Sequence, residues 1–202
     1  ILGSRDGVSL LAKKLLDYGM EQVRLFVGEQ LSYEQEKIIA GYPKDFVSYT
    51  GDPLSVVYAE NKAFVPDPAT HGIRDEEFIR DKVPMTKEEV RTVSLAKLGL
   101  FKDSVCWDVG AGTGSVSVEM ALRACEGRVY AIEKKSLAAE LLQKNKVKFA
   151  ADNLIVVEGE APEALEQLEA PTHAFIGGSS GNMKSIMELL LRKNPRVRIV
   201  IN

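Results

Sequence analysis

The sequence of 202 residues has few of the side chains from which metal and disulfide sites are built, with two cysteines and two histidines. Cys106 lies inside an apolar run and Cys125 near the end of a helical pattern, a spacing that fits neither a disulfide framework nor a set of metal ligands. We therefore predict two core thiols. His71 and His173 each stand alone, so the sequence predicts neither a zinc site nor a catalytic triad.

Long apolar runs and a strong bias of charge are also absent. No run approaches membrane-spanning length, and no charged-then-apolar leader opens the chain, so a cytoplasmic protein without a membrane partner is expected. The formal net charge of -3 argues against a nucleic-acid partner bound by broad phosphate neutralisation. We expect small-molecule partners and a homo-oligomer.

The first third of the sequence has an α/β rhythm. The patterns predict a helix over residues 8–16, a strand over 22–27, a helix over 33–40 and a strand over 54–58. Pro66 and Pro68 give the following residues the chemistry of a linker, and a domain boundary is predicted between residues 62 and 63. The start at Ile1 and the end after a strand-like run predict a fragment of a longer chain.

The rest of the chain predicts a doubly wound, mostly parallel α/β fold. Thr86 to Glu89 fit a capping box, which predicts a helix that starts at Thr86 with an apolar stripe of Val90, Val93 and Ala96. After it, strands are predicted over 105–109, 128–132, 154–157, 172–176 and 197–201, and helices over 115–124, 137–149, 163–168 and 183–191. Strict alternation with short connections indicates a parallel sheet with helices on both faces.

A glycine-rich loop, residues 110–114, follows the first of these strands. In such a sheet the ligand binds beyond the carboxyl ends of the strands, usually at the first strand-to-helix turn. The spacing G-x-G-x-G after Asp108 is typical of methyltransferases, whereas dinucleotide folds show G-x-G-x-x-G. A carboxylate near the loop suits a ligand with a sulfonium and an ammonium group better than a pyrophosphate. A purely structural glycine turn is the alternative.

Three later segments extend this candidate site. Glu133 ends the next strand, where an acid accepts hydrogen bonds from both ribose hydroxyls, the alternative being a solvated glutamate. Residues 158–162 are placed to border an adenine ring. Residues 176–182 hold three glycines and two serines in place of the Asn or Asp with two prolines of amine-methylating enzymes. They predict an uncharged cradle for substrate carboxylates, or else a flexible turn.

Four motifs resemble the decarboxylating precorrin methyltransferases of cobalamin biosynthesis. These motifs are Gly72-Ile73-Arg74-Asp75-Glu76-Glu77-Phe78, Pro84-Met85-Thr86-Lys87-Glu88-Glu89-Val90-Arg91, Trp107 to Ser115 around the glycine loop, and Phe175-Ile176-Gly177-Gly178. Members of that family methylate carbon 15 of the macrocycle and remove the carboxyl group of the carbon 12 acetate. The resemblance covers roughly Gly72 to Asn202 and implies a class I, Rossmann-like methyltransferase domain over residues 63–202.

The resemblance also implies a cofactor, S-adenosyl-L-methionine, and a tetrapyrrole (precorrin) substrate. Carried over by position, the cofactor contacts fall on Thr86, Gly110, Ala111, Gly112, Thr113, Gly114, Glu133 and Ala161. Side chains suited to substrate carboxylates flank the predicted mouth, namely Arg74, Arg80, Lys82, Lys134, Lys135 and Lys184. Each of these is more often a solvated surface charge, so no catalytic residue is assigned.

Residues 1–62 resemble the carboxyl-terminal part of a tetrapyrrole methylase that methylates carbon 5, with residues 27–31 and Glu36 as the matching features. The two parts are fused in the precorrin-6Y C(5,15)-methyltransferases (decarboxylating). By this resemblance two further strands should follow Asn202, so the methyltransferase domain is expected to be truncated. Two alternatives stay open, a methyltransferase for a nucleic-acid base or a protein, and a cofactor-binding fragment without turnover.

Overall fold

The structure, a computed structural model, describes residues 4–62 and 71–202. The chain divides into two compact units, Ile1–Pro68 and Ala69–Asn202, and each is described here by itself. The predicted domain boundary falls at the edge of residues 63–70, which lie outside the described residues. None of the described helices is long and apolar enough to cross a membrane.

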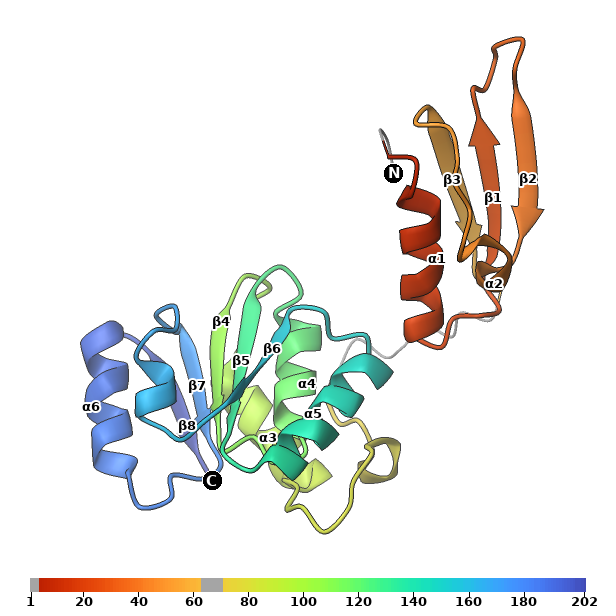
Figure 1. Ribbon diagram of the computed structural model, residues 1–202. Coiled ribbons are helices and arrows are strands. Elements are labelled where there is room, and N and C mark those ends of the chain that lie inside the picture. The colour runs from red at the N-terminus through yellow and green to blue at the C-terminus, as the bar shows by residue number, and fades with distance from the viewer. Residues whose placement is uncertain (1–3, 63–70) are drawn as a thin grey trace. The chain divides into compact units, whose positions relative to one another are not determined.

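The first unit is a small antiparallel sheet with helices on one face (Figure 1). Its elements are α1 (Gly7–Asp17), β1 (Arg24–Glu29), β2 (Lys37–Gly41), α2 (Pro43–Phe46) and β3 (Ser55–Glu60), with the strand order β2-β1-β3. Val8 and Ala12 of α1 pack against Leu25 and Val27 of β1. Alternate residues of a strand point to one face, so α1 lies over the inward-facing residues of β1.

The predicted helix over residues 33–40 is wrong, because residues 37–41 form β2 instead. This strand pairs antiparallel with β1, with Lys37 opposite Glu29. The reason is visible in its burial, since Ile39 packs on the core of the unit while Ile38 is 64% exposed. Burial therefore alternates with every second residue, as in a strand, rather than with the period of a helix. Pairing also carries β1 through Glu29, two residues beyond the predicted end.

The second unit is a parallel sheet of five strands covered on both faces, as predicted (Figure 1). Its strands are β4 (Val105–Val109), β5 (Arg128–Glu133), β6 (Leu154–Glu158), β7 (His173–Ile176) and β8 (Arg198–Ile201), in the order β6-β5-β4-β7-β8. Its helices are α3 (Glu88–Leu98), α4 (Ser115–Arg123), α5 (Ser136–Lys148) and α6 (Met183–Lys193), with the short turns η1 (Asp75–Glu77) and η2 (Glu163–Leu165).

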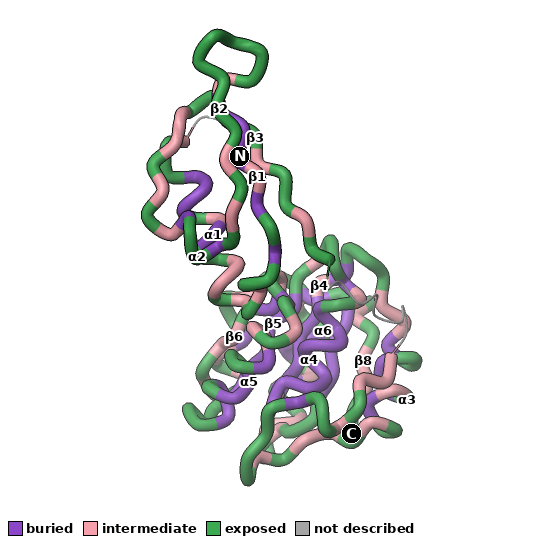
Figure 2. The backbone as a smooth tube through the Cα atoms, turned by 90° about the vertical axis from the view of Figure 1, so that its right-hand side faces the viewer, coloured by how far each residue is buried: buried purple, intermediate pink, exposed green. Residues whose placement is uncertain are grey.

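Each face of this sheet has its own apolar core. Cys106 points to the cluster with α3, α4 and α5, whereas its neighbour Trp107 points to the cluster with α6 and η2. Almost all of α4 is buried (Figure 2). The second face carries less helix than predicted, because the helix expected over 163–168 is only the turn η2. The chain order of the strands reverses direction between β4 and β7, which defines a topological switch point.

Two predictions about α3 are wrong. The helix begins at Glu88 after Lys87, and no side chain caps it, so the capping box at Thr86 does not form. The stripe with Val90 and Val93 faces outward, and Val93 is 59% exposed. The face that is buried instead contains Arg91, Ser94, Leu95 and Leu98. This face buries the apolar Leu95 and Leu98 together with Arg91, whose buried ion pair is described below.

The prediction of two core thiols holds for Cys106 and is wrong for Cys125, which is exposed. Burial and the nearby Asp108 carboxylate raise the pKa of Cys106 to about 12, so its thiol stays protonated and unreactive. We expect an alkylating reagent at about pH 8 to label one thiol per native chain and both after denaturation, as counted by mass spectrometry. Cys125→Ser should abolish native labelling. Rapid native labelling of that variant would contradict the buried position of Cys106.

Candidate active site

A cavity of about 370 Å³ lies at the carboxyl ends of the strands of the second unit. Residues at or just after the ends of all five strands, including Asn202 after β8, and from the segment before α3 surround it. Six of the eight predicted cofactor residues line it, namely Thr86, Gly110, Ala111, Gly112, Glu133 and Ala161. Thr113 and Gly114 do not line it. Asn145 of α5 donates to the Thr113 carbonyl at 2.9 Å, and a Cβ on Gly114 would lie 2.6 Å from Leu142 of the same helix.

The glycine loop needs glycine because of its conformation and its close neighbours. Gly110 and Gly112 have φ values of +75° and +56°, which disfavour any side chain. A Cβ on Gly110 would lie 2.7 Å from the carbonyl oxygen of Gly178, and one on Gly112 would lie 2.7 Å from that of Pro84. The loop is thus packed between the end of β7 and the segment before α3, at the switch point of the sheet.

The first three amides of the loop are already used within the protein. Gly110 N and Ala111 N both donate to the carbonyl of Ile132 at 3.0 Å, and Gly112 N donates to Glu133 at 2.9 Å. A pyrophosphate on a helix N-terminus needs such amides free to donate. The hydrogen bonding of the loop therefore argues against a dinucleotide.

Glu133 is the acidic group of the cavity that the loop itself orients. One carboxylate oxygen accepts from Gly112 N and the other from Lys135 N, each at 2.9 Å, and the residue is 8% exposed. Each oxygen of a carboxylate can accept more than one hydrogen bond. Two acceptors held in fixed positions on the cavity wall are suited to a pair of neighbouring hydroxyl groups.

Asp108, expected to face a cationic ligand, does not line the cavity. Its carboxylate is buried below the loop and accepts a short hydrogen bond from the Ser117 hydroxyl, while Oδ1 has no partner among the described residues. Burial raises the pKa of Asp108 to about 7, although the Ser117 hydrogen bond lowers it, and the charge of Glu133 raises it further. The carboxylates that line the cavity are those of Glu133 and Glu160.

The loops after β6 and β7 form the remaining walls. Gly159, Glu160 and Ala161 line the cavity after β6, and the Asn182 side chain donates to the Ala161 carbonyl at 2.9 Å. After β7, four further residues line it, namely Gly177, Gly178, Ser179 and Ser180. Both glycine amides donate to the carbonyl of Val109. The serines are therefore the part of the predicted cradle that is free to meet a substrate.

Of the six basic residues expected at the mouth, only Lys134 and Lys135 line the cavity. Lys134 forms an ion pair with Glu160 at 3.1 Å. Arg74 and Lys184 pair with acids of their own segments, Glu76 and Glu188. Arg80 and Lys82 are exposed and lie outside the lining. In residues 4–62 and 71–202, no group of His, Cys, Asp or Glu is placed to hold a metal ion.

The role of the segment before α3 was not predicted from the residues themselves. Val83, Pro84 and Met85 line the cavity together with Thr86, and they belong to no helix or strand. A proline within a polar stretch is typical of a loop and gives no sign of a binding wall. The only indication that this segment forms part of the site is the family resemblance, in which Pro84 to Arg91 is one of the four motifs.

The family model described as "Precorrin methyltransferase domain" matches residues 76–202, more than half of the chain. The chain belongs to this family. A precorrin methyltransferase domain thus accounts for all the strands of the parallel sheet and for the cavity, whereas the first unit lies outside the match.

Relatives of this precorrin methyltransferase domain carry concordant names. The protein "Probable cobalt-precorrin-6B C(15)-methyltransferase (decarboxylating)" of Sulfurisphaera tokodaii is 47% identical over 138 residues, which are 65% of this chain and 70% of that protein. The cobalt-precorrin-6B C(15)-methyltransferase (decarboxylating) of Salmonella typhimurium is 43% identical over 118 residues, or 57% and 60% of the two chains.

Two solved structures resemble the domain. One is the precorrin-6y C5,15-methyltransferase of Geobacter metallireducens, with a TM-score of 0.60 and 41% identity over 65% of this chain and 70% of that one. The other is a precorrin 8W decarboxylase of Methanobacterium thermoautotrophicum, with a TM-score of 0.60 and 36% identity over 64% and 70%. The predicted class I methyltransferase fold is confirmed by these likenesses.

Proposed function

We propose that the cavity binds S-adenosylmethionine and that the chain transfers its methyl group to carbon 15 of a precorrin, with loss of the carbon 12 acetate carboxyl group. The observation that carries the proposal is the glycine loop, which donates to Glu133 through Gly112 and has the amides of Gly110 and Ala111 occupied as well. This loop lies within residues 76–202, which match the precorrin methyltransferase domain family. The names of the relatives support the same substrate and the same two steps.

The residues of the cavity fit this cofactor. Its volume of about 370 Å³ is within the usual range for a small-molecule site. Gly110 and Gly112 have no Cβ, which lets the loop pack against the backbone of Gly178 and Pro84 in the cavity wall. Glu133 offers acceptors for both ribose hydroxyls, and residues 159–161 would border the adenine ring. The charge of Glu133 favours a cationic group beside it, whereas the charge of Glu160 is paired with Lys134.

The protein residues have two tasks in such a reaction. The bound cofactor would supply a methyl group on a sulfonium, so that a bond from the accepting carbon to the methyl forms as the bond to sulfur breaks and a neutral thioether leaves. The cavity walls hold the accepting carbon in line and keep water away. Ser179, Ser180 and Lys135 stand at the lining, where they would bind carboxylates of the substrate.

Glu133→Gln should weaken S-adenosylmethionine binding by about 10-fold to 100-fold, because a neutral amide loses charge-assisted hydrogen bonds to the ribose. Isothermal titration calorimetry measures this directly. Glu158→Gln is the matched control, since Glu158 lies opposite Glu133 in the register of β5 and β6 but outside the cavity lining. Equal affinities of Glu133→Gln and the wild-type chain would show that Glu133 does not bind the ribose.

Residues 1–62 are proposed to be the carboxyl-terminal part of a tetrapyrrole methylase domain. Their separate core and the start of the family match at residue 76 support a unit of different origin. The second unit, Ala69–Asn202, expressed alone should therefore keep the S-adenosylmethionine affinity of the whole chain. A large loss of affinity in this shorter chain, with its fold intact, would contradict the separation.

A further inference from the structure

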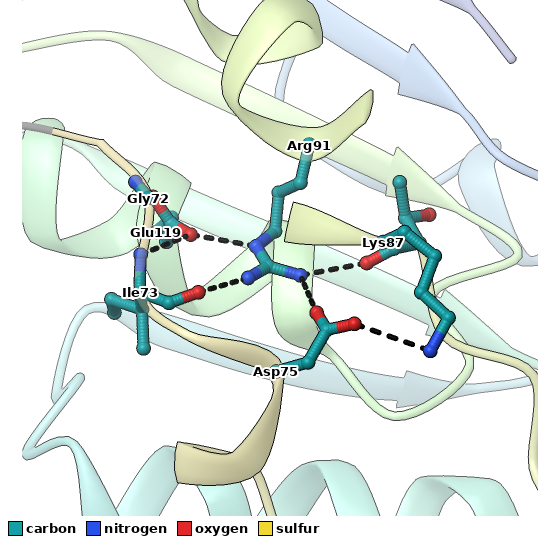
Figure 3. A network of polar contacts seen from close by, with 7 residues as sticks. Gly72, Ile73, Asp75, Lys87, Arg91 and Glu119 are labelled. Carbon is teal, nitrogen blue, oxygen red and sulfur yellow. Dashed lines mark hydrogen bonds and ion pairs between the residues drawn. The ribbon is translucent and has the colours of Figure 1, made fainter. Parts of the chain in front are cut away.

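Arg91 on α3 is a fully buried arginine that the cavity lining does not include. Its Nε donates to Glu119 of α4 at 2.6 Å, and Glu119 is itself 3% exposed. Among the ion pairs of the described residues, this is the one in which both side chains are buried (Figure 3). Burying two charges is costly unless their remaining hydrogen-bonding groups also find partners, so the other contacts of the pair are informative.

Those other contacts go to one segment, residues 72–86, as Figure 3 shows for most of them. The Arg91 guanidinium donates to the Asp75 carboxylate at 3.2 Å, to the Thr86 carbonyl at 2.6 Å and to the Ile73 carbonyl. The Phe78 ring covers it, with Cζ 4.8 Å from the ring centroid.

Glu119 binds the same segment from the other side. Its carboxylate accepts from the amides of Gly72 at 2.9 Å and Ile73 at 3.2 Å. The pair therefore holds the start of the segment through Gly72 and Ile73, and its end through Thr86.

The segment has other support mainly from side chains, because Phe78 is buried in the core, Ile73 and Met85 pack against that core, and Lys148 of α5 donates to the Glu77 carbonyl. Its only regular structure is the turn η1. Asn145 of α5 exchanges two hydrogen bonds with Ile79, each at 2.8 Å. Between Ile79 and Thr86, the backbone amides and carbonyls form no further hydrogen bond with another element of the described chain. This part is a strap held at one end by Asn145 and at the other by Arg91.

The strap carries the cavity wall formed by Val83, Pro84, Met85 and Thr86. The Pro84 carbonyl oxygen lies so near Gly112 that a Cβ there would be 2.7 Å away. A shift of the strap would therefore move this carbonyl against the glycine loop or away from it and so reshape the cavity.

We infer that Arg91 is a positioning residue, which fixes the strap against the glycine loop and thereby sets the affinity for the cofactor. The inference rests on the proposed function, because it takes the cavity to be the S-adenosylmethionine site. The Arg91 side chain does not line the cavity and so would not contact the cofactor itself. It acts through the Thr86 carbonyl and through Asp75.

Arg91→Lys tests this inference, because lysine keeps the charge but cannot direct separate donors to Glu119, Asp75 and two carbonyls at once. Without any ligand, we expect amide hydrogen exchange to rise in residues 72–87 and to stay unchanged in β4 and β5. The Kd for S-adenosylmethionine should rise about tenfold, and its KM likewise, while kcat at saturation stays within about threefold. Ile186→Val, a core change on the opposite face of the sheet, should leave the Kd and the exchange of the strap unchanged.

Asp75→Asn keeps the buried pair and removes the charge that pairs with both Arg91 and Lys87, so it decides the matter if Arg91→Lys does not fold. Asp75→Asn should also speed exchange in residues 72–87 and raise the Kd, by a smaller factor. Lys87→Gln removes only the Lys87 pair and is its control, which should leave the Kd unchanged. Unchanged exchange of the strap, or faster exchange with an unchanged Kd, would overturn the inference. Absence of cofactor binding by the wild-type chain would contradict the proposed function alone, and the exchange data would still judge whether Arg91 holds the strap.

Discussion

Gly112→Ala should lower the affinity for S-adenosylmethionine by about 100-fold or more, because the loop would have to leave its place in the cavity wall. Alanine at φ +56° is strained, and its Cβ would lie 2.7 Å from the backbone oxygen of Pro84, which cannot rotate away. Moving the loop also breaks the hydrogen bond from Gly112 N to Glu133. Titration calorimetry on the folded variant measures the loss.

Gly99→Ala separates backbone strain from loss of the site. Gly99 ends α3 at φ +60°, nearly the same conformation, but its added Cβ would meet only the flexible end of Arg198, at 3.1 Å. The left-handed conformation should cost each variant about 1 to 2 kcal/mol of stability, and Gly112→Ala should lose more because of its backbone clash. Only Gly112→Ala should lose binding. Equal affinities of the two variants would show that the loop does not form the cofactor site.

The buried Asp108 should make the free energy of unfolding fall as pH rises from about 4 to 7. Its folded pKa of about 7 exceeds the ordinary 3.8 because burial disfavours the charge. Between these values the unfolded chain has lost the proton and the folded chain retains it, so each rise in pH favours unfolding, up to about 4 kcal/mol in all. Above about pH 7 both states are charged, and the contribution becomes constant.

Urea unfolding at about pH 5 and about pH 8 measures this contribution as the difference between the wild-type chain and Asp108→Asn. The variant should gain stability relative to wild type at the higher pH, since the amide keeps a contact with Ser117 without a charge. Asp103→Asn, at an exposed aspartate of the same unit, should show no such difference. A pH-independent effect of Asp108→Asn would mean that Asp108 does not titrate in this range.

The strands of the second unit could be predicted from the sequence because a parallel sheet buries both faces and leaves uninterrupted apolar runs. Val105–Val109 has the predicted bounds, and the loop after it lies at the predicted edge of the sheet. The edge strand β2 could not be predicted in this way. Its hydrogen bonds to β1 decide its conformation, and the sequence of residues 33–40 does not indicate that β1 is its pairing partner.

The site was predictable only where one short motif holds its own geometry. The glycine loop and Glu133 are joined by a direct hydrogen bond across adjacent strands, so order along the chain already brings them together. Arg91 could not be found by such reasoning, because its partner Glu119 lies 28 residues away on another helix. A charged residue on a predicted helix is usually solvated, and only the fold shows that this one is buried.

Turnover of a cobalt-precorrin-6B preparation with S-adenosylmethionine labelled in its methyl group is the most direct test of the proposed activity. The label should enter the macrocycle at carbon 15, and carbon dioxide should leave the carbon 12 acetate, both detected by mass spectrometry. The Salmonella typhimurium relative serves as the positive control on the same substrate batch. Binding of the cofactor without label in the macrocycle or release of carbon dioxide, while the control turns over, would contradict the proposal.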